Sequence, residues 1–439
     1  MGSERTQQFI QAYRNLTLSP LAGEEEIAQF WVPAYGENAL ARLRQSVLLA
    51  EDNGRIWFSG QRGCGKSTLL GQLAKQLRQE GLFVVGFSVV DMIEMSDASH
   101  IIILYAIAIC LIERAQKQEV SIPPNIKSKL TAWFTHTGDA LYDEQLAESQ
   151  EKSQKKNQEK SQEAGLLELI KNKLKGESAF RAQIARKYEF RIDELVRQID
   201  LIAAAIQVAT GQPVVVIVDD LNKLPFGDFE AILREHAKAL WSPNIRLVFV
   251  VPVTAAGETA FSLSPYFSRE QVVLRTTQFF SRAQARATAA VPIEANVRLF
   301  EAVLQKRLPE TLIESETARQ MVLMSGGVMR NLIRLAAECC RECLMQMEET
   351  QNSEMKIDAD IFQAVMQSFR QEMSRPLGSN LYDLLVEIYQ AFGPPDARSD
   401  DFQSLLHGLY VLEYGEGEAL WYDLSPIVKD LLRRRGLID

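Results

Sequence analysis

The sequence has few cysteines, fewer basic than acidic residues, and no long apolar run. The five cysteines are an odd number without regular spacing, which argues against a disulfide framework. The net charge of −9 does not suggest a nucleic-acid coat or a membrane-surface binder, although a local basic groove would be compatible with it. The strongest apolar run, residues 101–112, is too short to span a bilayer and is better explained as a buried helix.

The sequence also shows neither a zinc-site pattern nor a signal-peptide pattern, and both bear on the cellular compartment that we expect. Cys339 and Cys343 lie one helical turn apart, but no histidine or cysteine pair nearby completes a zinc site, which favours core thiols. The N-terminus does not show the charged-then-apolar pattern of a signal peptide. We therefore expect a reducing, cytoplasmic setting. The apolar content of 46% and charged content of 24% are ordinary for a globular protein, and 439 residues allow two to three domains.

Residues 60–67 have the spacing G-x-x-x-x-G-K-S of a phosphate-binding loop. Residues 56–59 predict a strand directly before it, and residues 68–77 predict a helix directly after it, which is the context that such a loop requires. Glycines allow the sharp turn, the loop N–H groups form an anion nest, and the helix adds its positive end. The alternative is a glycine-rich turn that happens to contain Lys-Ser.

The loop residues have expected roles in binding ATP with Mg²⁺. Lys66 would reach the β- and γ-phosphates, and the Ser67 hydroxyl would ligate Mg²⁺. The residues that we expect around the nucleotide are Gly60, Gln61, Arg62, Gly63, Cys64, Gly65, Lys66, Ser67 and Thr68.

Two acids follow a second buried strand. Residues 214–218 form a continuous β-branched apolar run, which suits a strand covered on both faces, and Asp219 and Asp220 come directly after it. Acids at this end of a parallel strand lie at the ligand-binding edge of the sheet. Asp219 would hold Mg²⁺ through water, and Asp220 would polarise the attacking water. The alternative is a strand capped by two surface acids.

Three more strands complete the predicted sheet, at residues 82–89, 245–251 and 271–274. Helical patterns alternate with these strands, which predicts a parallel sheet with right-handed crossovers. Thr254 lies just past one strand, where its side chain would sense the γ-phosphate. A simple turn residue is the equal alternative for Thr254.

The first 50 residues read as helical, with a break at residues 33–36. A segment just before a phosphate loop often wraps the adenine ring, and Phe30, Trp31 and Tyr35 are candidates for this role. A hydrophobic staple onto the core is the alternative for these aromatic residues.

Residues 140–209 read as a helical insertion. Residues 145–164 are almost wholly polar, with four acids and four lysines, and cannot bury an apolar face. The following segment has apolar residues every three or four positions, which predicts an amphipathic helix. A solvated decoration and a partner-binding arm are both compatible with this pattern.

From residue 294 onward the pattern is helical. Helices are predicted near residues 294–308, 315–324, 328–347 and 358–373. Arg330 follows two glycines at the start of the third helix, which would aim it back toward the nucleotide, and Arg334 lies one turn on.

The last 62 residues predict a winged helix, with helices at 381–392 and 400–409, a β-hairpin at 411–424 and a final helix after Pro426. Residues 378–439 contain eleven acids against five lysines and arginines, and the presumed recognition helix starts with Asp400 and Asp401. This face would repel a duplex, because phosphate contacts supply most non-specific affinity. The charge favours a protein-contact or autoinhibitory wing.

The order of these features resembles an AAA+-type ATPase, and more narrowly the branch that contains the signal-transduction (STAND) ATPases and the origin-recognition initiators. The resemblance covers most of residues 27–439 and rests on residues 60–67, residues 214–220, the start of a lid helix at 326–330 and the winged helix. It implies that Arg330 is the lid's second sensor, which touches the γ-phosphate, and that Thr254 occupies the first-sensor position. Prokaryotic ATPases of this kind often occur in conflict or anti-phage systems, coupled to separate effectors.

The sequence also departs from the family pattern. Asp220 stands where the family has a catalytic glutamate, and the shorter acid, as in several STAND proteins, implies slow hydrolysis and a switch rather than a motor. Ring-forming members receive an arginine finger from a neighbour. The candidates here, among which the sequence does not choose and for most of which a surface charge is the alternative, are Arg269, Arg275, Arg282 and Arg286.

The predicted fold is α/β, with a parallel-sheet P-loop NTPase core and its helical insertion, followed by a helical lid and a C-terminal winged helix. The expected boundaries are residues 1–50 for an N-terminal helical segment, 51–290 for the ATPase core, 291–376 for the lid and 377–439 for the winged helix.

The predicted function is an ATP-binding, slowly hydrolysing switch that controls a partner protein or assembly, with anti-phage defence as one setting. The catalytic residues would be Lys66, Asp220, Thr254 and Arg330, with Ser67 and Asp219 as metal ligands. The insertion or the winged helix would bind the partner or a second copy. The alternative is an AAA+ ATPase that loads onto DNA or selects a DNA target, which requires a basic groove. A small-molecule phosphotransferase is disfavoured by the helical lid and the wing.

Overall fold

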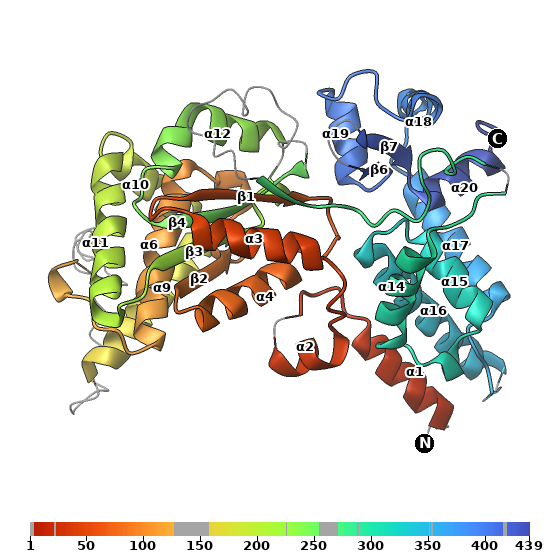
Figure 1. Ribbon diagram of the computed structural model, residues 1–439, viewed down its shortest axis with the longest axis horizontal. Coiled ribbons are helices and arrows are strands. Elements are labelled where there is room, and N and C mark those ends of the chain that lie inside the picture. The colour runs from red at the N-terminus through yellow and green to blue at the C-terminus, as the bar shows by residue number, and fades with distance from the viewer. Residues whose placement is uncertain are drawn as a thin grey trace. The chain divides into compact units, whose positions relative to one another are not determined.

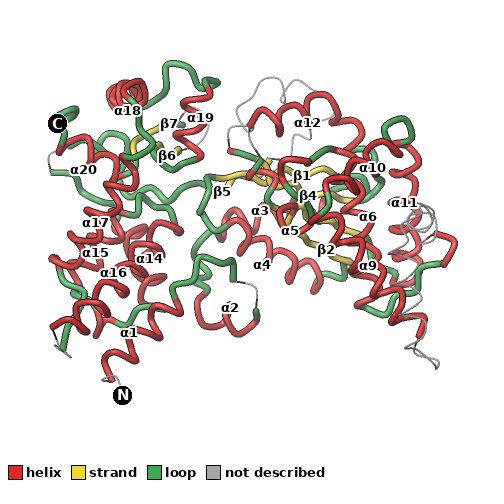
Figure 2. The backbone as a smooth tube through the Cα atoms, turned by 180° about the vertical axis from the view of Figure 1, so that it is seen from behind, coloured by secondary structure: helices red, strands yellow, loops and turns green. Residues whose placement is uncertain are grey.

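The computed structural model describes residues 4–21, 23–126, 158–224, 226–253, 271–287, 289–350, 352, 354–415 and 419–439. The chain divides into two compact units, whose helices and strands are labelled in Figure 1 and coloured by type in Figure 2. The first unit consists of Met1–Ala39, Gly60–Gly71 and Val273–Asp439, and the second of Leu40–Ser59 and Gln72–Val272. The phosphate loop (residues 60–67) therefore belongs to the first unit.

The second unit is built on the predicted parallel sheet. The strands are β1 (Arg55–Gly60), β2 (Phe83–Ser88), β3 (Val214–Asp219), β4 (Arg246–Val251) and β5 (Gln271–Leu274), in the order β2-β3-β4-β1-β5. Strand β3 pairs in parallel with β2 and β4, and β4 pairs in parallel with β1. Because β1 and β3 run the same way, their carboxyl ends lie at one edge of the sheet.

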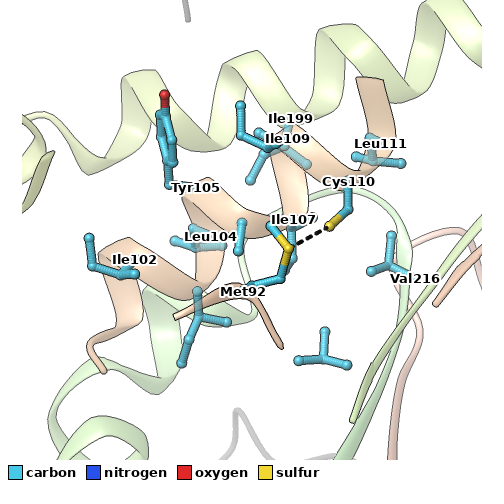
Figure 3. Packing of buried hydrophobic residues seen from close by; sticks show 14 of the residues in the cluster. Met92, Ile102, Leu104, Tyr105, Ile107, Ile109, Cys110, Leu111, Ile199 and Val216 are labelled. Atoms are coloured by element: carbon cyan, nitrogen blue, oxygen red, sulfur yellow. Dashed lines mark hydrogen bonds between the residues drawn. The ribbon is translucent and has the colours of Figure 1, made fainter. Parts of the chain in front are cut away.

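Helix α6 is the most apolar helix of the second unit, and its residues 101–112 are all buried. The Ser99 hydroxyl caps it by accepting a hydrogen bond from the Ile102 N–H at 3.3 Å. Figure 3 shows its side chains packed against Met92, Ile199 and Val216. The prediction of a buried helix at residues 101–112 is confirmed. The helices associated with the sheet are α3 (Glu37–Leu49), α4 (Lys66–Gln79), α5 (Val89–Met92), α6 (His100–Lys117), α9 (Gln158–Gly176), α10 (Ser178–Tyr188), α11 (Ile192–Thr210) and α12 (Phe226–Leu240).

The described part of the predicted insertion is built into the core of the second unit. Ile170 of α9, Ile184 of α10 and Ile199 of α11 are fully buried in the same hydrophobic cluster as α6. The Arg181 guanidinium, with 5% of its side chain exposed, pairs with Asp97 at 2.6 Å. From residue 167 onward the amphipathic face is therefore core, and the part of the insertion at residues 140–157 lies outside the described residues.

The first unit contains a bundle of helices at the predicted lid positions. Helix α1 packs on α16, and the Arg5 guanidinium donates to the backbone carbonyls of Thr311 and Met355, which ties the N-terminal helix to the lid. The helices outside the winged helix are α1 (Glu4–Asn15), α2 (Glu24–Phe30), α14 (Glu294–Gln305), α15 (Ser315–Met324), α16 (Met329–Thr350) and α17 (Ala359–Ser374).

The C-terminal part of the first unit is a winged helix. Strands β6 and β7 form an antiparallel hairpin. The hydroxyls of Ser399 and Ser425 cap the two helices that follow them, and Pro426 occupies the first turn of the last one. Its elements are α18 (Ser379–Ala391), α19 (Asp400–His407), β6 (Val411–Tyr414), β7 (Trp421–Leu424) and α20 (Pro426–Arg434). The predicted fold class is confirmed.

Three remaining sequence features can be compared with the structure. All five cysteines are buried free thiols, as expected for core residues. Within the described ranges, no three or more His, Cys, Asp and Glu side chains are grouped so as to hold a metal ion. In the same ranges, no helix is long and apolar enough to cross a membrane.

Candidate nucleotide-binding site

The phosphate loop turns from β1 into α4, which begins at Lys66. Gly63 has φ +81°, and a Cβ on it would lie 2.7 Å from the Cβ of Arg330. Both the left-handed backbone and this close approach require glycine at that position. The predicted strand, loop and helix are therefore all present in this order.

Lys66 closes the loop upon itself. Its ammonium donates to the carbonyl of Gly60 at 2.7 Å and to that of Gln61 at 3.0 Å, and the residue is 6% exposed. A buried lysine that is held by neutral carbonyls gains a stronger partner when an anion enters the loop. The residues present thus fit a phosphate group, as the spacing predicts. The hydroxyl of Thr68, also predicted to lie near the nucleotide, accepts a hydrogen bond from the Leu21 N–H at 3.2 Å.

Tyr35 contacts the phosphate loop through both its hydroxyl and its ring. Its hydroxyl donates to the Cys64 carbonyl at 2.7 Å, and the ring lies 3.4 Å from the position of a Cβ on Gly65. Burial raises the pKa of Tyr35 well above its ordinary value, so the hydroxyl keeps its proton and remains a donor. Burial also raises the pKa of the Cys64 thiol, which marks it as a packing group rather than a nucleophile.

The aromatic residues proposed for adenine binding are largely used in packing. Phe30 is 7% exposed, and the Arg307 guanidinium lies 5.0 Å from its ring centroid. Tyr35 is 4% exposed and meets Phe300 edge to face, with 5.9 Å between ring centroids. For these two rings the hydrophobic staple describes the structure.

We expect Tyr35→Phe to weaken ATP binding about five- to tenfold, because the loop loses one buried hydrogen bond worth about 1 kcal/mol. Isothermal titration of ATP–Mg²⁺ into both proteins measures the difference. Tyr13→Phe is the matched control, since Tyr13 is 44% exposed on α1. Equal affinities for Tyr35→Phe and Tyr13→Phe would show that the hydroxyl does not support the loop.

The start of helix α16 is bonded to the phosphate loop. The backbone N–H of Arg330 donates to the Gly63 carbonyl at 3.0 Å. Arg330 thus lies at the loop, where the Gly-Gly sequence before it was expected to direct it, and its role toward a γ-phosphate remains a prediction. Arg334 faces α17 instead, where it pairs with Glu372 at 2.5 Å and lies over the ring of Phe369.

The winged helix is bonded to the same loop through the side chain of Gln61. Its amide nitrogen donates to the Val411 carbonyl at 2.7 Å and to the Leu406 carbonyl at 3.4 Å. Its amide oxygen accepts from the Glu413 N–H and from the Thr276 hydroxyl, each at 3.0 Å. Gln61 is 2% exposed, so this amide is buried with both of its ends in use.

This contact was not predicted, although Gln61 was expected to lie near the nucleotide. Gln61 occupies a position of the motif at which any residue is allowed, so its identity carries no signal. A second residue that sequence reasoning missed is His407, at the end of α19. Partial shielding from solvent lowers the pKa of His407, and the positive charges of Arg62 and Lys66 lower it further.

The two predicted acids stand at the end of β3 in the second unit. Asp220 has φ +70°, an uncommon conformation for a residue other than glycine, and is 9% exposed. Its carboxylate accepts from the Ser88 hydroxyl at 2.6 Å and pairs with Lys223 at 2.9 Å. The Asp219 carboxylate accepts from the Asp220 N–H at 2.7 Å. Both acids therefore lie at the predicted sheet edge, and Ser88 and Lys223 are neighbours that the sequence did not single out.

The remaining predicted residues divide into two groups. Thr254 and Arg269 lie outside the described residues. Arg275, Arg282 and Arg286 are engaged with the winged helix of their own unit. Arg275 pairs with Glu413 at 3.3 Å, and the guanidiniums of Arg282 and Arg286 lie 5.1 and 3.3 Å from the ring centroid of Phe392.

Comparison with known proteins gives weak likenesses. No family model and no curated protein matches the chain. Among solved structures, it is similar to Cdc6p from Pyrobaculum aerophilum, with a TM-score of 0.38, 10% identity, and coverage of 96% of this chain and 98% of that one. It is also similar to the Orc1 protein of Aeropyrum pernix in complex with DNA, with a TM-score of 0.41, 12% identity, and coverage of 95% and 96%. A RuvB variant from Thermotoga maritima gives a TM-score of 0.38 at 12% identity, with coverage of 95% and 98%. These values support no conclusion about activity.

Proposed function

We propose that the protein is an ATP-binding, AAA+-like switch that hydrolyses ATP slowly and controls a partner protein or assembly. The observation that carries the proposal is that one phosphate loop is bonded both to the start of α16, through Gly63 and Arg330, and to the winged helix, through Gln61. A ligand in this loop acts on both sets of bonds at once. Two elements that respond to one ligand can produce a conformational switch.

Each site residue has a role in this proposal. The backbone N–H groups of the loop and the Lys66 ammonium hold the phosphates, and Ser67 and Asp219 hold Mg²⁺. Bound Mg²⁺ neutralises phosphate charge and stabilises the leaving oxygen. Lys66 exchanges the carbonyls of Gly60 and Gln61 for a phosphate, which changes the backbone of the residue whose side chain holds the winged helix.

Slow hydrolysis is supported by the surroundings of Asp220. Its carboxylate already accepts from Ser88 and pairs with Lys223, so a water must compete with these groups for it. Arg330 is proposed as the lid residue that senses the γ-phosphate, and Thr254 as the corresponding sensor of the sheet. These roles follow from the resemblance described above.

The first test of the proposal is Gln61→Ala. We expect it to loosen the winged helix, because the carbonyl of Val411 and the N–H of Glu413 lose a buried partner, at a cost of about 2–4 kcal/mol. Amide hydrogen exchange of β6 should become at least tenfold faster, while Lys66 still binds ATP. The matched control is Gln403→Ala, which removes an exposed amide from α19. Unchanged exchange in β6 would contradict the coupling between loop and wing.

A second test uses Arg330→Ala. The wild-type protein should change its radius of gyration on addition of ATP–Mg²⁺, as measured by small-angle X-ray scattering, and Arg330→Ala should bind ATP without this change. Arg334→Ala is the control, because Arg334 pairs with Glu372 and not with the loop. If Arg330→Ala responds to ATP as the wild type does, the proposed sensor role is wrong. The same measurement gives the molecular mass, and so reports self-association.

The alternative, a DNA-loading or target-selecting ATPase, has less support. Helix α19 begins with Asp400 and Asp401, and the Leu406 carbonyl near its end is bonded to Gln61. A filter-binding titration across salt concentrations distinguishes the two proposals, because binding through phosphates falls steeply with salt. Salt-sensitive DNA binding with DNA-stimulated hydrolysis would favour the alternative. The anti-phage setting is tested by phage challenge of cells that carry the wild type or Lys66→Ala.

A further inference from the structure

A cavity of about 750 Å³ lies within the first unit, away from the phosphate loop's own residues. Its walls come from the segment after Thr277, from α15 and α17, and from the winged helix. Pockets of roughly 300–1,000 Å³ typically hold small molecules, so this volume suits a ligand of nucleotide size.

Six of the residues that line the cavity are aromatic. A planar or apolar ligand body would find ring faces and edges there and would be removed from water. The aromatic lining residues are Phe279, Phe280, Phe362, Tyr389, Tyr414 and Trp421.

Charged side chains also line the cavity. Five basic side chains line the cavity, Arg286, Arg370, Lys429, Arg433 and Arg434, against three acids, Asp423, Asp430 and Asp439. Two of the acids are already paired, since Asp430 pairs with Arg370 at 2.7 Å and with Arg434 at 3.3 Å, and Asp423 pairs with Lys429. The lining therefore has an excess of positive charge.

Arg286 forms no printed ion pair among the described residues, and Asp423, the acid that acts on it electrostatically, is paired with Lys429. Its Nη1 donates to the Gln390 carbonyl at 3.1 Å, while its Nε and Nη2 are shielded from solvent and have no hydrogen-bond partner among the described residues. The guanidinium lies 4.3 Å from the ring centroid of Tyr389 and 3.3 Å from that of Phe392. Shielded donors without partners are costly, and the guanidinium can turn about its side-chain bonds to meet an anion in the cavity.

We propose that this cavity binds an aromatic anion, whose flat body packs against the aromatic lining residues and whose acidic group pairs with Arg286. The site does not depend on the proposed ATP site. The cavity does include Gly326, which lies just before α16. The Gly326 carbonyl accepts a hydrogen bond from the Tyr414 hydroxyl of the winged helix at 2.8 Å. A ligand here would therefore stabilise the winged helix in contact with the residues that precede α16.

The test compares two fluorescent probes that differ by one sulfonate group. The anion 8-anilinonaphthalene-1-sulfonate and its neutral parent N-phenyl-1-naphthylamine are titrated, without nucleotide, into the wild-type protein and into Lys66→Ala, whose phosphate loop has lost its ammonium. We expect a single saturable site that binds the sulfonate at least tenfold more tightly than the neutral probe. Equal affinities would overturn the proposal.

The variant Arg286→Met, which keeps side-chain length and loses the charge, should bind both probes equally, with sulfonate affinity reduced about tenfold. Arg286→Lys should recover part of the difference. Arg298→Met, at an exposed arginine of α14, is the matched control and should behave as the wild type. Retained neutral-probe binding shows that Arg286→Met is folded. Unchanged sulfonate affinity in Arg286→Met, or an equal loss in Arg298→Met, would overturn the assignment of the anion to Arg286.

Discussion

Lys66→Ala is expected to lower the affinity for ATP–Mg²⁺ at least 100-fold. Lys66 is the only ammonium that the loop itself carries, and it is 6% exposed with its nitrogen held inside the loop. Charge-assisted hydrogen bonds to phosphate contribute about 1.5–3 kcal/mol each, and about 2.7 kcal/mol corresponds to 100-fold. Isothermal titration or displacement of a fluorescent ATP analogue measures the loss.

Two further variants test whether the loss of ATP affinity is specific to Lys66. Lys75→Ala removes an exposed lysine from the same helix and should leave ATP affinity within twofold of the wild type. Asp220→Ala should keep ATP binding and reduce turnover, because Asp220 is proposed to act on water and not on the phosphates. Equal ATP affinity in Lys66→Ala and the wild type would remove the basis of the proposed function.

Gly327→Ala is expected to destabilise the first unit by about 3 kcal/mol or more, the range of severe backbone and packing clashes. Gly327 has φ +76°, and a Cβ on it would lie 1.7 Å from the carbonyl oxygen of Thr277. A backbone oxygen at that distance cannot move aside as a flexible side chain would. The thermal unfolding midpoint of the variant should fall by several degrees.

The control for Gly327→Ala is Gly211→Ala. Gly211 has a similar φ of +70°, but a Cβ there meets nothing within 4 Å. The control therefore carries the conformational cost alone, which is about 1 kcal/mol. A loss of stability in Gly327→Ala no greater than that in Gly211→Ala would mean that the chain around Thr277 yields, contrary to our expectation.

The elements of the fold could largely be predicted because each has a strong local pattern. Three patterns can be recognised from neighbouring residues alone. They are the loop spacing at residues 60–67, the β-branched run of β3 and the apolar run of α6. The lid and winged-helix elements were also found within a few residues, because Ser399, Ser425 and Pro426 mark helix starts.

The long-range contacts of the site residues could not be predicted in the same way. Gln61 bonds to residues about 350 positions away, and no local pattern distinguishes an amide that serves the wing from one that faces solvent. Tyr35 had two open roles, and only its burial against Phe300 selects the hydrophobic staple. Asp220 was recognised by its position after β3, whereas its partners Ser88 and Lys223 come from chain geometry that the pattern does not encode.

The first unit gathers three stretches, Met1–Ala39, Gly60–Gly71 and Val273–Asp439, around one loop. During synthesis, the ribosome completes this loop long before residues 330, 406 and 413 emerge. A nascent chain therefore holds the motif without the carbonyls and N–H groups that later fix it. Under the proposed function, ribosome-bound chains halted before the winged helix should bind ATP through Lys66, whereas only the released protein should change its conformation in response.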